Sequence, residues 1–100
     1  MKSDTGGIFM NALEKNRLII NEADDELVKL FEKRMHAVKE ILAYKKENGL
    51  PVLDASREAD NIARNCAKVQ DEELKKYFRK WYEETMAVSR AYQEDLLERK

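Results

Sequence analysis

The segment from Asn11 to Asn48 contains neither glycine nor proline, and this feature limits most strongly what the chain can fold into. Its apolar residues recur at three- and four-residue spacing, which is typical of an amphipathic helix. These residues are Leu13, Ile20, Ala23, Leu27, Leu30, Phe31, Val38, Ile41 and Leu42. Asn11, with Glu14 three residues later, predicts a capping box. The helix is expected to stop at Asn48, because Gly49 suits a helix end and Pro51 prevents continuation.

Two further helices are predicted after this long one. Residues 49–55 read as a loop, and a short helix is expected from about Ser56 to Lys68. Asp71 is a plausible N-cap for a third helix that runs to the end of the chain. Residues 1–10 read as a flexible lead-in. The sequence therefore predicts an all-α fold with one long, one short and one long helix, in a single domain over residues 11–100.

The first helix is longer than a compact monomer of this size can cover. About 37 residues at 1.5 Å each span roughly 55 Å, whereas a globular domain of 100 residues is roughly 35 Å across. Because the helix carries apolar residues throughout, we expect it to pack against a second copy in a homodimer. A plain helical hairpin or a coiled-coil dimer satisfies the same observation.

Composition excludes several classes of protein. The chain has 19 basic and 20 acidic residues and a net charge of −1, so nothing indicates a nucleic-acid partner. No apolar run reaches the ~20 residues of a membrane span, and residues 1–9 do not resemble a signal peptide. The single cysteine, Cys66, reads as a small apolar core residue in a reducing compartment. A cytoplasmic protein is expected.

Polar residues interrupt the apolar faces of both long helices. In steps of seven residues along the predicted helix, Arg34 lies on the same line as Ile20, Leu27 and Ile41. Lys45 lies on the corresponding line of Phe31 and Val38. The two cations, 11 residues apart, are separated by about 20° of rotation and 16 Å of rise. On the third helix, Ser89 and Gln93 stand between Met86 and Leu96.

Such cations are open to two structural interpretations. Long basic side chains often lay their stems on apolar surface and extend the charge into water, and a polar core residue can set the register of a helix dimer. Both interpretations weaken because polar groups recur on two helices. Inward-facing cations without a counter-charge are costly. The pattern therefore favours a small anionic ligand enclosed by helices.

Other kinds of catalytic centre lack candidates. The sequence has no Cys/His cluster, no phosphate-binding glycine loop and no nucleophile elbow. His36 stands alone, without a second ligand at metal spacing. No metal and no cofactor are expected, which leaves catalysis by positioning and electrostatics.

Five segments resemble the all-helical class of chorismate mutases. They are Asn16–Asn21, Glu32–Met35, Tyr44–Asp54, Arg57–Glu58 and Ser89–Gln93. The resemblance runs from about Leu13 to Leu97. It implies three helices per subunit, intertwined in a homodimer, and an isomerase that rearranges chorismate to prephenate in tyrosine and phenylalanine biosynthesis.

The resemblance also implies roles for eight residues, all of which carry the expected residue type. Arg17 reaches the partner chain's site, and Arg34 binds a carboxylate. Lys45 lies near the ether oxygen and a carboxylate, and Glu58 binds the ring hydroxyl. The others are Asp54 and Arg57, which border the substrate, and Ser89 and Gln93, of which the glutamine donates to the ether oxygen. Lys45, Gln93, Arg34 and Glu58 are the implied catalytic residues.

One departure and two alternatives remain. The family often has an Ile-Asp pair where this chain has Ile20-Asn21, which affects expected dimer contacts rather than catalysis. Pyruvate elimination from isochorismate on the same fold is the nearest alternative, but the combination of Asp54, Arg57 and Glu58 favours the mutase. A non-catalytic helical dimer serving as a binding or regulatory module is the other, and the retention of all eight polar positions argues against it.

Overall fold

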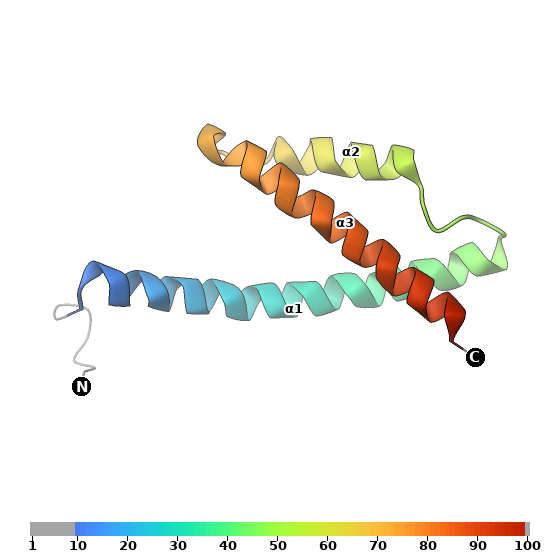
Figure 1. Ribbon diagram of the computed structural model, residues 1–100, viewed down its shortest axis with the longest axis horizontal. Helices are drawn as coiled ribbons and strands as arrows, with labels where there is room; N and C mark the ends of the chain where they lie inside the picture. The colour runs from blue at the N-terminus through green and yellow to red at the C-terminus, as the bar shows by residue number, and fades with distance from the viewer. Residues whose placement is uncertain (1–9, 100) are drawn as a thin grey trace. The chain divides into compact units, whose positions relative to one another are not determined.

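The computed structural model describes residues 10–99, and this part of the chain is helical without any strand. Its elements are α1 (Ala12–Glu47), α2 (Ala55–Cys66), the short 3₁₀ helix η2 (Glu72–Leu74) and α3 (Lys75–Glu98) (Figure 1). The predicted all-α fold with a long, a short and a long helix is confirmed. The predicted flexible lead-in, apart from Met10, lies outside the described residues.

The chain divides into two units, with the boundary inside α1 between His36 and Ala37. The described part of the first unit is the N-terminal part of α1. The predicted capping box opens this helix: the Glu14 N–H donates to Asn11 Oδ1 at 2.8 Å, and the Asn11 N–H donates to Glu14 Oε1 at 3.2 Å. These bonds satisfy two of the N–H groups that a helix start leaves without a partner.

The second unit contains the last turns of α1 and everything that follows. Helix α1 ends where the sequence predicts, because Gly49 adopts a φ of +64°, a left-handed conformation that glycine adopts without steric cost. The Leu50 N–H then donates to the Lys45 carbonyl at 2.8 Å, which satisfies one carbonyl of the last turn.

Helix α2 begins one residue earlier and ends two residues earlier than predicted. Its N-cap is Asp54, whose side chain accepts from the Arg57 N–H at 3.0 Å. At the other end, the helix gives way to a turn in which the Lys68 N–H donates to the Asn65 carbonyl at 3.1 Å. The Asn65 amide donates to the Tyr82 hydroxyl at 3.1 Å, which links α2 to α3.

The prediction that Asp71 caps the third helix is wrong. Asp71 instead caps η2, because its side chain accepts from the Glu73 N–H at 3.1 Å and its carbonyl accepts from the Leu74 N–H at 3.0 Å. This three-residue spacing is that of the tighter 3₁₀ helix. Helix α3 follows from Lys75 without a side-chain cap.

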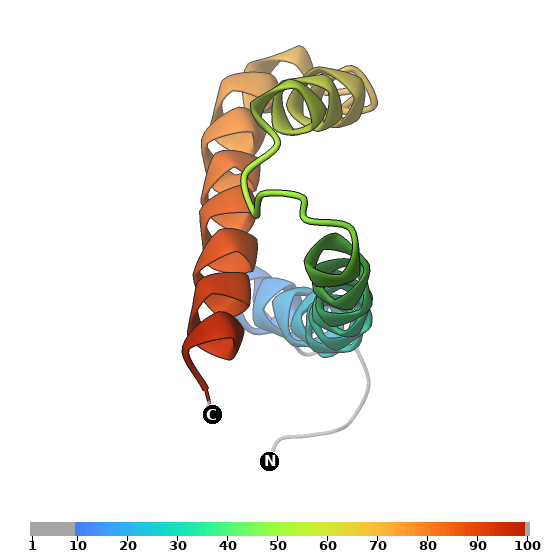
Figure 2. The ribbon, with the colours of Figure 1, turned by 90° about the vertical axis from the view of Figure 1, so that its right-hand side faces the viewer.

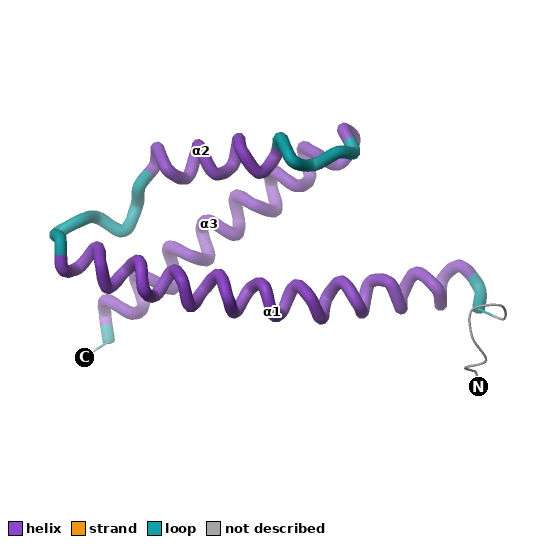
Figure 3. The backbone as a smooth tube through the Cα atoms, turned by 180° about the vertical axis from the view of Figure 1, so that it is seen from behind, coloured by secondary structure: helices purple, strands orange, loops and turns teal. Residues whose placement is uncertain are grey.

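Helices α2 and α3 pack against each other beside η2 and diverge away from it (Figures 1 and 3). The stacked rings of Phe78 and Tyr82 lie near this junction, with centroids 5.6 Å apart. Figure 2 shows the C-terminal half of α3 passing beside the last turns of α1. The buried side chains of the described residues come from these two stretches: Val38, Leu42, Met86, Ser89 and Gln93.

Several predicted core positions are exposed in the single chain. Ile41, Leu74, Trp81 and Val88 are all about half exposed or more, and Cys66 is only partly buried. Periodicity identifies an apolar face but does not say whether the same chain covers it. Among the described helices, none has an apolar stretch long enough to cross a membrane.

Candidate active site

The inward face of α3 carries two buried polar side chains. Ser89 is 7% exposed and Gln93 is 6% exposed, and they follow Met86, which is 4% exposed, by about one and two helical turns. The stripe of polar residues read from the sequence is therefore a buried stripe. Buried polar atoms normally find hydrogen-bond partners, so the partners of these two residues are informative.

Gln93 is incompletely satisfied. Its Nε2 donates to the Ser89 carbonyl of its own helix at 3.2 Å, while its Oε1 is buried without any hydrogen-bond partner among the described residues. The Ser89 hydroxyl donates to the Thr85 carbonyl at 3.0 Å. Leaving a buried acceptor unsatisfied costs about 1–3 kcal/mol. Gln93 therefore retains hydrogen-bonding capacity for a polar ligand.

Lys45 stands in the last turn of α1 with its side chain partly buried. Its Nζ donates to the Val52 carbonyl in the following loop at 2.7 Å. An ammonium group has three donors, so this bond leaves two for other acceptors. The bond also fixes the side chain against the loop that leads to Asp54.

The N-cap and the first turn of α2 hold three of the predicted residues. Asp54 and Arg57 are exposed, and the Asp54 carboxylate is engaged in capping the helix. Glu58 is partly buried, and its Oε1 accepts from Nη1 of Arg90 on α3. This ion pair connects residues 32 positions apart in sequence.

Arg90 has no role in the sequence-based prediction, although it lies within one of the five resembling segments. An arginine beside a buried serine reads as a surface residue. No periodicity within α3 indicates a partner on α2, so only the packing of the two helices reveals the pair.

The two predicted arginines of the long helix, Arg17 and Arg34, belong to the first unit. Arg17 is exposed and Arg34 is partly buried. The other six predicted residues all belong to the second unit: Lys45, Asp54, Arg57, Glu58, Ser89 and Gln93. Within that unit, hydrogen bonds tie Lys45 to the loop before α2 and tie Glu58 to α3.

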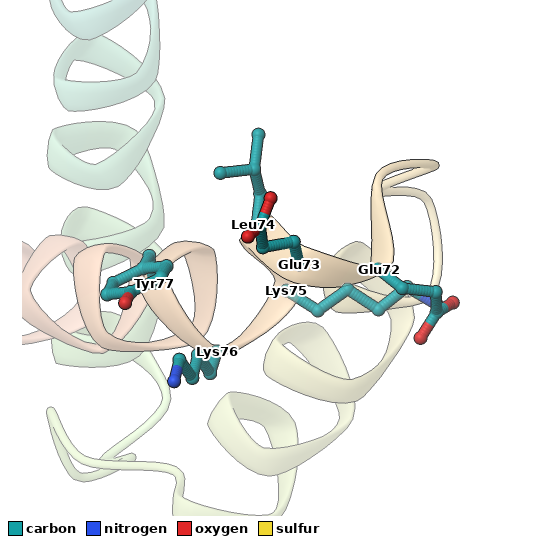
Figure 4. A pocket seen from close by; sticks show the side chains of 6 residues that line it. All are labelled: Glu72, Glu73, Leu74, Lys75, Lys76 and Tyr77. Carbon is teal, nitrogen blue, oxygen red and sulfur yellow. The ribbon is translucent and has the colours of Figure 1, made fainter.

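A shallow pocket elsewhere contains none of these residues. It is lined by the consecutive residues 72–77, where η2 passes into α3 (Figure 4). An ion pair between Lys75 and Glu72, 2.8 Å apart, lies in its lining, and the Lys76 ammonium is 5.1 Å from the Tyr77 ring centre. The pocket is a local feature of this turn.

The second unit thus contains cationic donors, a buried amide and a paired carboxylate. This set can bind carboxylate and hydroxyl groups and can donate to an oxygen that gains negative charge. Among residues 10–99, no three His, Cys, Asp or Glu side chains are grouped as a metal ion would need.

Comparison with models of protein families matches residues 16–94 to chorismate mutase type II. The match covers the two long helices almost completely, the short helix between them and all eight predicted residues. Neither the curated proteins nor the solved structures give a match.

Proposed function

Because the chain belongs to the chorismate mutase type II family, we propose that it is a chorismate mutase that rearranges chorismate to prephenate. This reaction belongs to tyrosine and phenylalanine biosynthesis, and we place the protein in the cytoplasm. The substrate carries two carboxylates, a ring hydroxyl and an enolpyruvyl ether. The rearrangement breaks the ether C–O bond while a new C–C bond forms. It is unimolecular and needs neither a nucleophile nor a cofactor.

The observation that best supports this proposal is that the buried side-chain amide of Gln93 has unused hydrogen-bonding groups. Its amide is 6% exposed and its Oε1 has no partner in the described part of the chain. Nε2 has two hydrogens and uses one on the Ser89 carbonyl, so the other is available. A buried donor that is positioned before the reaction stabilises developing charge most effectively. We assign this hydrogen to the ether oxygen of chorismate.

Lys45 is assigned to the same oxygen. Its ammonium, held by the Val52 carbonyl at 2.7 Å, keeps two donors for the ether oxygen and the neighbouring carboxylate. A preorganised donor at such an oxygen contributes about 3–4 kcal/mol to lowering the barrier. Two donors on different helices also restrict the substrate to its reactive chair-like conformer.

The remaining residues bind the substrate's periphery. Arg34 and the partner chain's Arg17 bind carboxylates, for which a guanidinium offers two parallel hydrogen bonds. Glu58 accepts from the ring hydroxyl. The other three residues, Asp54, Arg57 and Ser89, border the substrate.

A homodimer is part of this proposal. The N-terminal part of α1 carries large apolar side chains that are between 41% and 60% exposed. They are Leu13, Leu18, Ile19, Ile20, Leu27, Val28, Leu30 and Phe31. Burial of apolar surface contributes about 25 cal/mol per Å², and a second copy of α1 offers a matching surface. In the resulting dimer each site receives Arg17 from the other chain.

Product identification tests the proposed activity. Purified protein is incubated with chorismate, and separately with isochorismate, and the products are identified by NMR. We expect prephenate from chorismate. Salicylate and pyruvate from isochorismate, without prephenate, would indicate the lyase alternative. Loss of neither substrate would indicate a non-catalytic helical module.

A further inference from the structure

The ion pair between Arg90 and Glu58 differs from others on this chain. Its side chains are 32% and 22% exposed, and it joins two helices. Three other pairs join side chains only three or four positions apart, and each has at least one side chain that is 58% exposed or more. They are Glu26–Lys29, Glu72–Lys75 and Arg79–Glu83. Exposed pairs of that kind contribute little to stability. The Arg90–Glu58 pair is of a different kind, because it is more enclosed and fixes a side chain of one helix to another helix.

The pair holds the Glu58 carboxylate at one place between α2 and α3. Glu58 lies in the first turn of α2, well away from η2, and the two helices have diverged there (Figure 1). A glutamate side chain has three rotatable bonds, and ordering it costs up to about 1.5–2 kcal/mol. The bond from Arg90 Nη1 to Glu58 Oε1 selects one conformer before any ligand arrives. The carboxylate still has acceptor capacity for a ligand hydroxyl.

Charge gives a second reason for the pair. A substrate with two carboxylates is repelled by a third carboxylate nearby, and the repulsion is strong where water is excluded. Arg90 places a permanent positive charge against Glu58. Glu58 can then accept from a hydroxyl without presenting a net negative charge to a dianion.

Arg90 also lies in the sequence between residues of the buried stripe. Ser89 precedes it and Gln93 follows three residues later, both facing inward. Arg90 is itself partly buried and reaches α2 from the flank of this stripe. The hydroxyl-accepting group is thereby attached to the same helix as the proposed ether-oxygen donor.

We propose that Arg90 is a positioning residue, which orients and neutralises Glu58 so that the site accepts the ring hydroxyl of its dianionic substrate. This inference rests on the proposed function. Because Arg90 acts through Glu58, its contribution disappears when the substrate has no ring hydroxyl. The hydroxyl takes no part in the bonds that break or form, so an analogue with hydrogen in its place can still rearrange.

The test compares kcat/KM of the Arg90→Gln chain for chorismate and for this deoxy analogue. Misplacement of a binding group costs up to about a hundredfold, and we expect a loss of about tenfold or more with chorismate. With the analogue we expect less than about a twofold loss. Arg90→Lys should give a smaller loss, again confined to chorismate, because lysine keeps the charge without the planar fork. Arg79→Gln, which removes an exposed pair on the same helix, is the matched control and should change neither value.

A double-mutant comparison completes the experiment. In a Glu58→Ala background, Arg90→Gln should cause little further loss with chorismate, because its partner is absent. Equal losses for both substrates, or full loss in the Glu58→Ala background, would overturn the inference and indicate direct substrate binding or a general structural role. If Arg90→Gln does not fold, the same substrate comparison with Arg90→Lys decides the matter. An unmodified chain that leaves chorismate unchanged would remove the proposed function and this inference together.

Discussion

At the scale of single residues, the buried stripe on α3 was predictable because helical spacing fixes which residues share a face. Met86, Ser89 and Gln93 are all buried, as their spacing implies. The pairing of Arg90 with Glu58 was not predictable, because it depends on how two helices pack across 32 positions of sequence. Local spacing therefore locates inward-facing polar residues, while tertiary packing decides their partners.

The unsatisfied amide of Gln93 leads to a prediction about stability. Replacement of Gln93 by methionine, a side chain of similar size, removes a buried oxygen that has no partner in the described chain. We expect the free energy of unfolding to be unchanged or higher, by up to about 1–3 kcal/mol. Urea denaturation followed by circular dichroism measures the difference.

The reciprocal variant is the control for this prediction. Met86→Gln puts an amide at another buried position of the same helix face, which is 4% exposed, and it should lower the free energy of unfolding by about 1–3 kcal/mol. If Gln93→Met is destabilised as much as Met86→Gln, the protein itself satisfies the hydrogen-bonding groups of the Gln93 amide, and they are not available to a ligand.

At the scale of elements, the helix ends divide into those with local signals and those without. The capping box at Asn11 and the glycine at position 49 each act through residues within four positions, and both ends were predicted to within a residue. The start of α3 was not, because an aspartate such as Asp71 caps a 3₁₀ turn as well as an α-helix. Propensity gives no means of distinguishing these two cases.

Asp54 allows a structural role to be separated from a proposed substrate contact. It caps α2, so Asp54→Ala should lower the free energy of unfolding by about 1 kcal/mol. Asparagine caps a helix equally well, so Asp54→Asn should retain full stability. If Asp54 also borders the substrate, the asparagine variant should lose activity while its melting curve is unchanged. Unchanged kcat/KM in Asp54→Asn would limit this residue to its capping role.

At the scale of the whole molecule, the sequence shows more apolar surface than one chain covers. The length and composition of α1 predict this, and the exposed apolar residues of its N-terminal part agree with it. The identity of the covering partner depends on a second chain, which no pattern within one sequence specifies. The homodimer is therefore a proposal with its own tests.

One test disrupts the proposed interface. Leu27→Glu places a charge among the exposed apolar residues of α1 and should convert the dimer to a monomer in sedimentation at micromolar concentration. The unmodified chain should sediment at about twice its 11.8 kDa mass. Leu74→Glu, at an exposed leucine outside α1, should leave the dimer intact. A monomeric unmodified chain with full activity would contradict the dimer and the shared site.

A second test addresses the shared site by complementation. Arg17→Ala and Arg34→Ala should each be nearly inactive. Mixed in equal amounts with exchange of subunits, they form heterodimers in which one site carries both lesions and the other carries neither. Activity should rise to about a quarter of the unmodified value, because half of the molecules are heterodimers with one intact site of two. Verified exchange without any rise would show that Arg17 does not act across the interface.

The proposed activity and the role of Gln93 are tested together by the rate of prephenate formation from chorismate, measured for the unmodified chain and for Gln93→Met at equal concentrations of folded protein. The unmodified chain should form prephenate, and Gln93→Met should be slower by about a hundredfold or more, since one donor to a developing oxyanion contributes about 3–4 kcal/mol. An unmodified chain without prephenate formation, or a Gln93→Met chain of equal rate, would contradict this proposal.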